Sequence, residues 1–211
     1  MTDPDPNRPE PPWRPLLTGE AADAARAAVD DIAAELAAAP PGEAPAAGRD
    51  LSLAGGQAGR ALFFAYLDAA RPDLGHDEAA MTCLERAIAG TAELPASSGL
   101  YSGFAGVAWV LEHLQGRLFD AEGEDPGEEI ATVLREHLER SPWRGDYDLI
   151  SGLVGFGVYA LERRPRPGGR ECLEEIVARL AETAERRPEG VTWHSAPELI
   201  GPYQRETYPE G

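Results

Sequence analysis

Hydrophobic residues recur every three or four positions in four separate segments of the chain. The segments span about 20–38, 77–94, 127–140 and 170–187. In the first segment the apolar face consists of Ala25, Val29, Ile32 and Leu36. A helix with one apolar and one polar face lies at the surface of a helical core. We therefore predict four amphipathic helices, each of which buries one side.

Three shorter runs between these segments are apolar on every side. They span 61–67, 107–111 and 156–161. A helix without a polar face has to be buried all round, so these runs predict inner helices. No run alternates convincingly between apolar and polar residues, so no β-strand is predicted in the body of the chain.

A short glycine motif precedes each inner run. Its pattern is Leu-x-(Gly/Ser)-Gly-x-(Ala/Val)-Gly, and its copies occupy 53–59, 100–106 and 149–155. The central glycines are Gly56, Gly103 and Gly152. They lie 47 and then 49 positions apart, and a fixed period of this length indicates a repeat architecture. The lysine of a phosphate-binding loop follows none of the copies, so we interpret the glycines as architectural.

The order of the elements predicts stacked helical hairpins. An amphipathic helix, a glycine motif and an inner helix recur three times before a fourth amphipathic helix follows. Hairpins stacked side by side bury the apolar helices and leave the amphipathic ones outside. The predicted fold is all-α, an α/α toroid of helix-hairpin repeats, present here as an incomplete arc of about three and a half hairpins.

Three regions are expected along the chain. Residues 1–15 form a proline-rich, flexible leader, 16–187 form the helical-hairpin repeats, and 188–211 form an irregular, proline-rich tail before a missing fourth inner helix. The repeats at the two ends of such an arc lack a neighbour on one side. We therefore expect the chain to self-associate or to be only marginally stable.

The charge balance limits the partners. With 37 acidic and 19 basic residues the net charge is -18, which disfavours nucleic acid and anionic membranes and fits a basic partner. The two cysteines, Cys83 and Cys172, make no disulfide framework. Neither a signal peptide nor a transmembrane segment is visible in the sequence, so a cytoplasmic location is expected.

The three motifs and their flanks resemble the N-terminal part of the lanthionine synthetase C-like (LanC-like) family. The strings that carry the resemblance are SLAGGQAGRALF (52–63), GLYSGFAG (99–106) and DYDLISGLVG (146–155). The resemblance covers about 13–211 and implies an α/α toroid of seven helical hairpins. It also implies a cyclase that adds a peptide cysteine to dehydroalanine or dehydrobutyrine and so closes a thioether ring.

The resemblance further implies a cofactor and partners. In the family, Zn²⁺ held by two cysteines and a histidine keeps the attacking sulfur as a thiolate. The substrate is a ribosomal precursor peptide, and a lanthipeptide dehydratase is a possible partner. The family's Trp-Cys, Cys-His-Gly and Ala-His-Gly strings occur nowhere in this chain, which ends about where a fourth motif would begin. For this chain alone we therefore expect no metal ligands, no cofactor and no activity.

Two alternatives to the cyclase remain open. The chain fits a truncated or degenerate family member that binds a peptide or a partner protein without catalysis. Other α/α toroids are glycosidases, which need two carboxylates at one mouth. Only Asp148 qualifies as such an acid here.

Asp148 is the residue that the resemblance carries over as catalytic. It matches the aspartate that opens the family's third motif, where it assists proton transfer, and its alternative interpretation is a helix cap. His194 is the candidate substrate-binding residue, although a lone histidine in a proline-rich loop is usually polar surface. The other candidates have structural interpretations: solvent-facing or capping positions for His76, His113 and His137, and small buried positions for Cys83 and Cys172.

Overall fold

A computed structural model describes residues 15–38, 49–72, 74–93, 97–120 and 125–210. The chain divides into two compact units, Met1–Pro40 and Pro41–Gly211. The described part of the first unit is dominated by α1 (Gly19–Ala38), an alanine-rich helix that confirms the helix predicted over 20–38. The predicted apolar face is not the buried one: Ala22 and Ala33 are buried, whereas Ile32 is 48% exposed. The predicted leader, apart from its last residue, lies outside the described residues.

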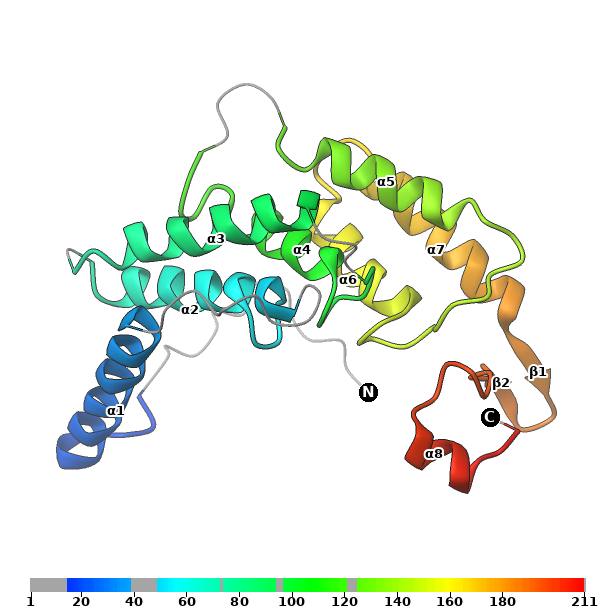
Figure 1. Ribbon diagram of the computed structural model, residues 1–211, viewed down its shortest axis with the longest axis horizontal. Coiled ribbons are helices and arrows are strands. Elements are labelled where there is room, and N and C mark those ends of the chain that lie inside the picture. Colours follow the sequence, from blue (N-terminus) through cyan, green and yellow to red (C-terminus); the bar gives the residue numbers. More distant parts are fainter. Residues whose placement is uncertain (1–14, 39–48, 73, 94–96, 121–124, 211) are drawn as a thin grey trace, which may run out of the picture. The chain divides into compact units, whose positions relative to one another are not determined.

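The second unit is built mainly of helices (Figure 1). Its elements are η1 (Arg49–Leu51), α2 (Gln57–Ala70), α3 (His76–Glu93), α4 (Phe104–Leu114), α5 (Glu128–Leu138), α6 (Leu153–Arg163), α7 (Gly169–Thr183), β1 (Glu185–Arg187), β2 (Gly190–Thr192) and α8 (Pro202–Thr207). The predicted outer helices correspond to α3, α5 and α7, and the predicted inner helices to α2, α4 and α6. The helical-hairpin order is therefore confirmed. Among the described residues, none of the helices combines the length and the apolarity needed to cross a bilayer.

Every inner helix begins directly after the central glycine of its motif. The N-caps are Gly56, Gly103 and Gly152, all with extended backbone. A Cβ on Gly103 would overlap the carbonyl oxygen of Ser97, and one on Gly152 would overlap that of Asp146. The loop before each helix thus folds back over the helix N-terminus, and only glycine leaves room for it. This geometry supports the architectural interpretation of the motif.

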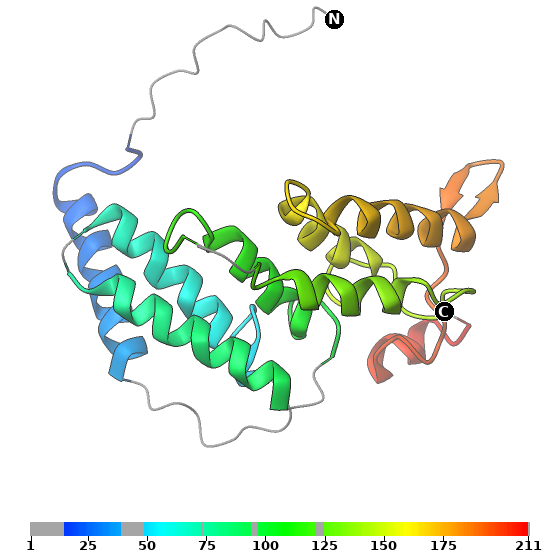
Figure 2. The ribbon, with the colours of Figure 1, turned by 90° about the horizontal axis from the view of Figure 1, so that it is seen from above.

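The inner helices pack against one another in chain order. α2 contacts α4 and α4 contacts α6, while α3 lies along α2 and α7 lies along both α5 and α6 (Figures 1 and 2). In the third hairpin, Leu134 of α5, Phe156 of α6 and Cys172 of α7 are all fully buried in one cluster. The core therefore lies between inner and outer helices, as the two apolar patterns predicted.

Successive glycine motifs are joined by the same backbone hydrogen bond. The N–H of Ala54 donates to the carbonyl of Tyr101 at 3.0 Å, and the N–H of Tyr101 donates to the carbonyl of Ile150 at 3.1 Å. These three residues occupy the same position in the three motifs. The repeats are thus linked at the N-terminal ends of their inner helices by equivalent contacts.

The first leucine of a motif makes a second repeated contact. A Cβ on Gly106 would come within 2.9 Å of the Cβ of Leu53, and one on Gly155 would come within 3.0 Å of the Cβ of Leu100. The last glycines of the second and third motifs therefore receive the leucine of the preceding repeat, and a larger residue there would push the two repeats apart.

Polar side chains join the inner helices near their other ends. The hydroxyl of Tyr66 lies 2.7 Å from Nε2 of His113, and Nδ1 of His113 lies 3.1 Å from Oε1 of Glu162. The His113 side chain is only 13% exposed, so the expectation that it faces solvent or caps a helix was wrong. Its partners come from the two neighbouring repeats, which the pattern of a single helix does not reveal.

A buried ionic cluster joins α4 to α6. Arg163 is fully buried, and its guanidinium contacts the carboxylate of Glu112 and lies 2.6 Å from that of Asp125. Arg166 contacts the same Glu112 carboxylate. The hydrogen bond from Arg163 is the main reason why the pKa of Asp125 lies below its usual value.

The segment expected to be irregular, 188–211, is partly ordered. α7 ends at Thr183, and β1 and β2 then form an antiparallel hairpin before the short helix α8. Pro188 and Glu189 form the turn between the two strands, and Gly190, the first residue of β2, has a φ of 147°, which favours glycine. Each of these elements is too short to show a hydrophobic period, which is why the sequence pattern missed them.

Candidate functional site

Asp148 holds the turn that opens the third glycine motif. Its Oδ1 accepts hydrogen bonds from the backbone N–H groups of Ile150 and Ser151, the latter at 2.8 Å. The Ser151 hydroxyl donates to Oδ2 of Asp148 at 3.3 Å. The N-cap of α6 is Gly152, which has no side-chain cap. Asp148 therefore caps the turn before the helix rather than the helix itself.

A second acid, Asp146, lies in the same loop. Its carboxylate lies 3.4 Å from the Ser151 hydroxyl, so both acids meet at one hydroxyl group. Burial raises the pKa of the Asp146 carboxyl, and the charge of Asp148 raises it further. The loop thus pairs a carboxylate that accepts several hydrogen bonds with a neighbour that keeps its proton more readily.

Asp146 was not singled out from the sequence. The available signal was the string Asp-Tyr-Asp at the start of the motif, in which two acids stand two positions apart. The effect of burial on Asp146 could not be read from that string, because it depends on how the loop is covered in the folded chain.

The hairpin of β1 and β2 brings His194 to a small pocket beside this loop. The pocket has a volume of about 100 Å³ and is lined by the aromatic rings of Trp143, Tyr147 and Trp193, with Arg144 and His194 also in its wall. His194 thus shares a pocket with Tyr147, the neighbour of Asp148. Among the described residues no hydrogen bond joins His194 to Asp148 itself.

The aromatic walls of this pocket are held in place. The indole N–H of Trp193 donates to the carbonyl of Leu180 at 2.8 Å, and that of Trp143 donates to the carbonyl of Asp146 at 3.1 Å. The ring centroids of Tyr147 and Trp193 are 6.0 Å apart. The pocket is therefore formed mainly by the tail and by the loop that precedes the third motif.

The remaining histidines have structural surroundings. His76 is the first residue of α3, and its ring stacks on Phe64. His137 is half-buried against the edge of Trp143, and burial, helped by the charge of Arg140, lowers its pKa. The expectation of a solvent-facing or capping position therefore fits His76 better than His137.

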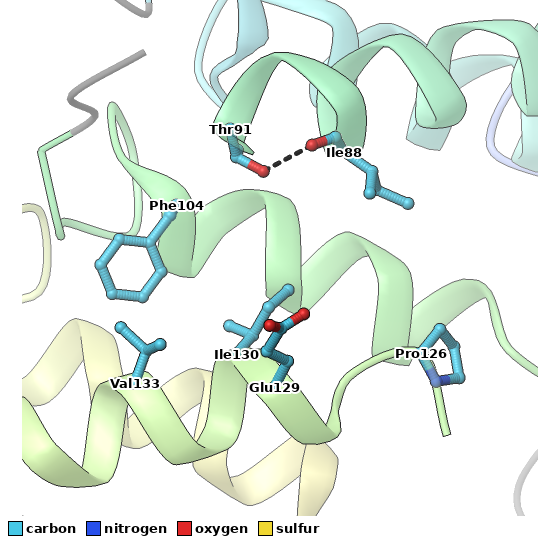
Figure 3. A pocket seen from close by; sticks show the side chains of 7 residues that line it. All are labelled: Ile88, Thr91, Phe104, Pro126, Glu129, Ile130 and Val133. Atoms are coloured by element: carbon cyan, nitrogen blue, oxygen red, sulfur yellow. Dashed lines mark hydrogen bonds between the residues drawn. The ribbon is translucent and has the colours of Figure 1, made fainter. Parts of the chain in front are cut away.

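A larger groove lies away from the third motif, between α3, α4 and α5. Its volume is about 420 Å³. Figure 3 shows its apolar side chains, with Phe104 and Val133 near one end and Pro126 near the other. Glu129 adds a carboxylate, while the hydroxyl of Thr91 already donates within its own helix. The groove thus offers an apolar surface with one negative charge.

A family model described as "Lanthionine synthetase C-like protein" matches residues 48–198. The matched span includes all three glycine motifs and most of the chain. The chain belongs to the lanthionine synthetase C-like family. Within the matched span, this LanC-like chain carries both Asp148 and His194.

The fold of this LanC-like chain is shared with a solved structure named "Nisin cyclase". The match has a TM-score of 0.62 at 20% sequence identity and covers 90% of this chain. It confirms the predicted fold, a part of an α/α toroid. The chain spans 48% of the length of that cyclase. No curated protein matches the sequence of the chain.

Zinc is generally associated with LanC-like proteins, but the described residues do not fit it. Within the described ranges no group of three or more His, Cys, Asp or Glu side chains could hold a metal ion. Cys83 on α3 and Cys172 on α7 are free and buried, as predicted, and burial raises the pKa of each thiol. A raised pKa disfavours the thiolate that zinc binds. No zinc-dependent step follows from these residues.

Proposed function

We propose that this chain supplies the first repeats of a lanthipeptide cyclase. The reaction joins a cysteine of a ribosomal precursor peptide to a dehydroalanine or dehydrobutyrine and forms a lanthionine thioether ring. The observation that carries the proposal is the family match over residues 48–198, a span that includes the third motif. The proposed setting is the cytoplasm, beside the dehydratase that prepares the peptide.

The proposed role of Asp148 is to assist proton transfer. When the cysteine sulfur attacks the β-carbon of the dehydrated residue, a C–S bond forms and the π electrons move into an enolate. That enolate then takes a proton on the α-carbon, and a nearby acid makes this step easier. Asp148 and Asp146 share the hydroxyl of Ser151, and the raised pKa of Asp146 favours a proton at this place.

The proposed role of His194 is to contact the substrate. It lines a pocket whose volume of about 100 Å³ suits one small side chain, and the pocket adjoins the loop that carries Asp148. Fixed aromatic walls bind an apolar side chain with little loss of conformational freedom. His194 and Arg144 supply the polar groups that orient such a ligand.

The chain is proposed to be inactive by itself. The two thiols are buried and the described residues include no set of zinc ligands. The acid–base loop would therefore act only together with groups that lie outside these residues. The chain alone is expected to bind the dehydrated peptide without closing rings.

The test measures zinc, ring closure and peptide binding on the purified chain. Mass spectrometry of metals is expected to find well under one zinc per chain. Alkylation of free thiols is expected to show no ring formation in a dehydrated, cysteine-containing precursor peptide. Fluorescence anisotropy is expected to show binding, weakened several-fold by His194→Ala and unchanged by Glu174→Gln on the exposed face of α7. Stoichiometric zinc or ring closure would overturn the proposed inactivity, and absence of peptide binding would overturn the substrate role.

A second candidate function is non-catalytic binding of a peptide or partner protein. The groove between α3, α4 and α5 favours it, because apolar walls and Glu129 suit an amphipathic, basic segment. The net charge of -18 also attracts such a segment. Val133→Arg would place a positive charge in this groove and abolish binding there. If binding survives Val133→Arg and weakens in His194→Ala, the pocket beside the third motif is the site instead.

A further inference from the structure

The small pocket beside the third motif carries hydrogen-bond donors that the described residues leave unused. Arg144, Tyr147 and His194 all line this pocket. Within the described ranges, no hydrogen bond or ion pair involves the guanidinium of Arg144, the hydroxyl of Tyr147 or the ring of His194. By contrast, the guanidinium groups of Arg163 and Arg166 both contact carboxylates. Donors that line one pocket and have no internal acceptor are available to a ligand that brings acceptors.

The charge of this pocket is opposite to that of the chain as a whole. The chain has a net charge of -18, yet none of the described residues that line the pocket is an Asp or a Glu. Two acids of the adjoining loop, Asp146 and Asp148, both meet the hydroxyl of Ser151. Glu182, which precedes a lining residue, pairs with Arg179. The unpaired guanidinium of Arg144 therefore makes the pocket locally attractive to an anion.

A carboxylate fits these donors and the size of the pocket. Its two oxygens can accept both N–H groups on one edge of a guanidinium, and such charge-assisted pairs are stronger than neutral hydrogen bonds. The imidazole of His194 keeps an N–H donor even when neutral, and the phenol of Tyr147 adds an O–H donor. The volume of about 100 Å³ admits one short side chain but not a nucleotide. The rings of Trp143 and Trp193 can cover the methylene groups beside the carboxylate.

We propose that this pocket is a subsite for a carboxylate of the precursor peptide, in which Arg144 pairs with the charge and His194 and Tyr147 donate hydrogen bonds. The identity of the peptide rests on the proposed function, whereas the preference for a carboxylate rests only on the pocket. An acidic side chain and the C-terminus of the peptide carry the same group, and the experiment below distinguishes these two sources.

Such a subsite would set the register of the peptide. Tyr147 lines the pocket and directly precedes Asp148 in the chain. Successive residues of an extended peptide lie only about 3.3–3.6 Å apart. When a carboxylate is held in the pocket, residues close to it in the peptide therefore lie beside the loop of Asp146 and Asp148. The subsite thus selects which part of the peptide meets these two acids.

The test is an NMR titration of the full chain with three short peptides. Two are tripeptides blocked at both ends, with a central glutamate or a central glutamine, and the third consists of alanines with a free C-terminal carboxylate. The indole N–H signals of Trp143 and Trp193 report on the pocket, and that of Trp109, which stacks on His113, is the internal reference. The glutamate peptide should shift both reporter signals to saturation, and the glutamine peptide should bind at least about tenfold more weakly.

Three exposed positions give the matched variants. Arg144→Gln should weaken binding of the glutamate peptide about tenfold, because it removes the charge that pairs with the carboxylate. His194→Asn should weaken it several-fold. Arg186→Gln removes the same charge from β1 outside the pocket and should change nothing, so it separates direct contact from the general effect of net charge. Circular dichroism checks that each variant is folded.

The outcomes separate this proposal from the proposed function. No saturable shift with either carboxylate, equal saturable binding of the glutamate and glutamine peptides, or equal effects of Arg144→Gln and Arg186→Gln would each overturn the subsite. Binding of the alanine peptide alone would support the subsite and assign the C-terminal carboxylate as its ligand. A chain that binds the glutamate peptide selectively but not the precursor peptide would lose the cyclase role and keep the subsite. Precursor binding without any selectivity for a carboxylate would do the reverse.

Discussion

Arg163 of α6 and Glu112 of α4 form an ion pair inside the interface between the second and third repeats. Their side chains are 0% and 1% exposed, and they lie 51 positions apart in the sequence. Two charges are thus buried between the second and third repeats. At the equivalent place between the first and second repeats, the side chains are those of Ala65 and Leu114. A buried pair of this kind contributes little net stability when intact, but either partner left alone is strongly unfavourable.

Breaking this pair should therefore destabilise the chain far more than breaking a surface pair. Glu112→Gln or Arg163→Met alone is expected to lower the free energy of unfolding by about 1.5–3 kcal/mol, because Asp125 still pairs with Arg163 and Arg166 still pairs with Glu112. The double variant Glu112→Leu with Arg163→Met should lose less than the sum of the two. Urea denaturation measures all three, and Arg170→Met, which breaks the exposed pair with Glu174, is the control and should change little. Equal losses at the two pairs would contradict the argument.

The last glycine of each motif should tolerate no side chain. Gly106→Ala places a Cβ against the carbonyl oxygen of Leu100 and against Leu53 of the preceding repeat. The expected loss is about 2–3 kcal/mol of unfolding free energy, since backbone and neighbouring repeat both have to move. Gly55 in the first motif has open space around it, so Gly55→Ala is the matched control and should be neutral or slightly stabilising. Thermal melting followed by circular dichroism distinguishes the two variants, and equal melting temperatures would refute the close-approach explanation.

The repeat architecture could be predicted because the same physical requirement recurs three times. Each inner helix starts where a glycine lets the preceding loop cross its N-terminus, and Gly56, Gly103 and Gly152 mark these starts in the sequence itself. The outer helices were visible because one face of each must stay polar. Both signals are local, so an isolated sequence displays them.

The contacts between repeats could not be predicted in the same way. A lone histidine in a helical pattern, such as His113, suggests a surface position. In the structure, however, Tyr66 and Glu162 from the neighbouring inner helices contact it on both sides. The pKa of Asp146 is raised mainly because its carboxyl is partly buried in the folded loop, and this burial cannot be inferred from the spacing of residues in the sequence. The tail hairpin depends on the turn at Pro188 and Glu189 and on the pairing of two strands of three residues each. Long-range partners and burial decide these features, and the site beside the third motif depends on both.

Neutralising Asp146 should stabilise the chain at neutral pH. Its folded-state pKa is raised, so the ionised carboxyl is less favourable in the folded than in the unfolded chain. Asp146→Asn is expected to raise the melting temperature at pH 7, and this gain should vanish as pH falls below the unfolded-state pKa near ~3.9. Asp148→Ala is the contrasting variant. It removes the acceptor for two backbone N–H groups and should cost about 1 kcal/mol. A lower melting temperature for Asp146→Asn at pH 7 would show that its charge is needed for the fold.

Acid should weaken the interface between the second and third repeats through Asp125. The hydrogen bond from Arg163 holds the folded-state pKa of Asp125 below its usual value, so the folded chain releases this proton more readily than the unfolded chain does. Its contribution to stability is therefore complete above the unfolded-state pKa near ~3.9 and is lost as pH falls through the lower folded-state value. Asp125→Asn should be less stable than the wild type at pH 7, and the difference should disappear in strong acid. Unfolding free energies measured across this pH range test the prediction, with Glu174→Gln as the exposed control. A difference between wild type and Asp125→Asn that stays constant with pH would mean that the Asp125 side chain acts through packing and not through its charge.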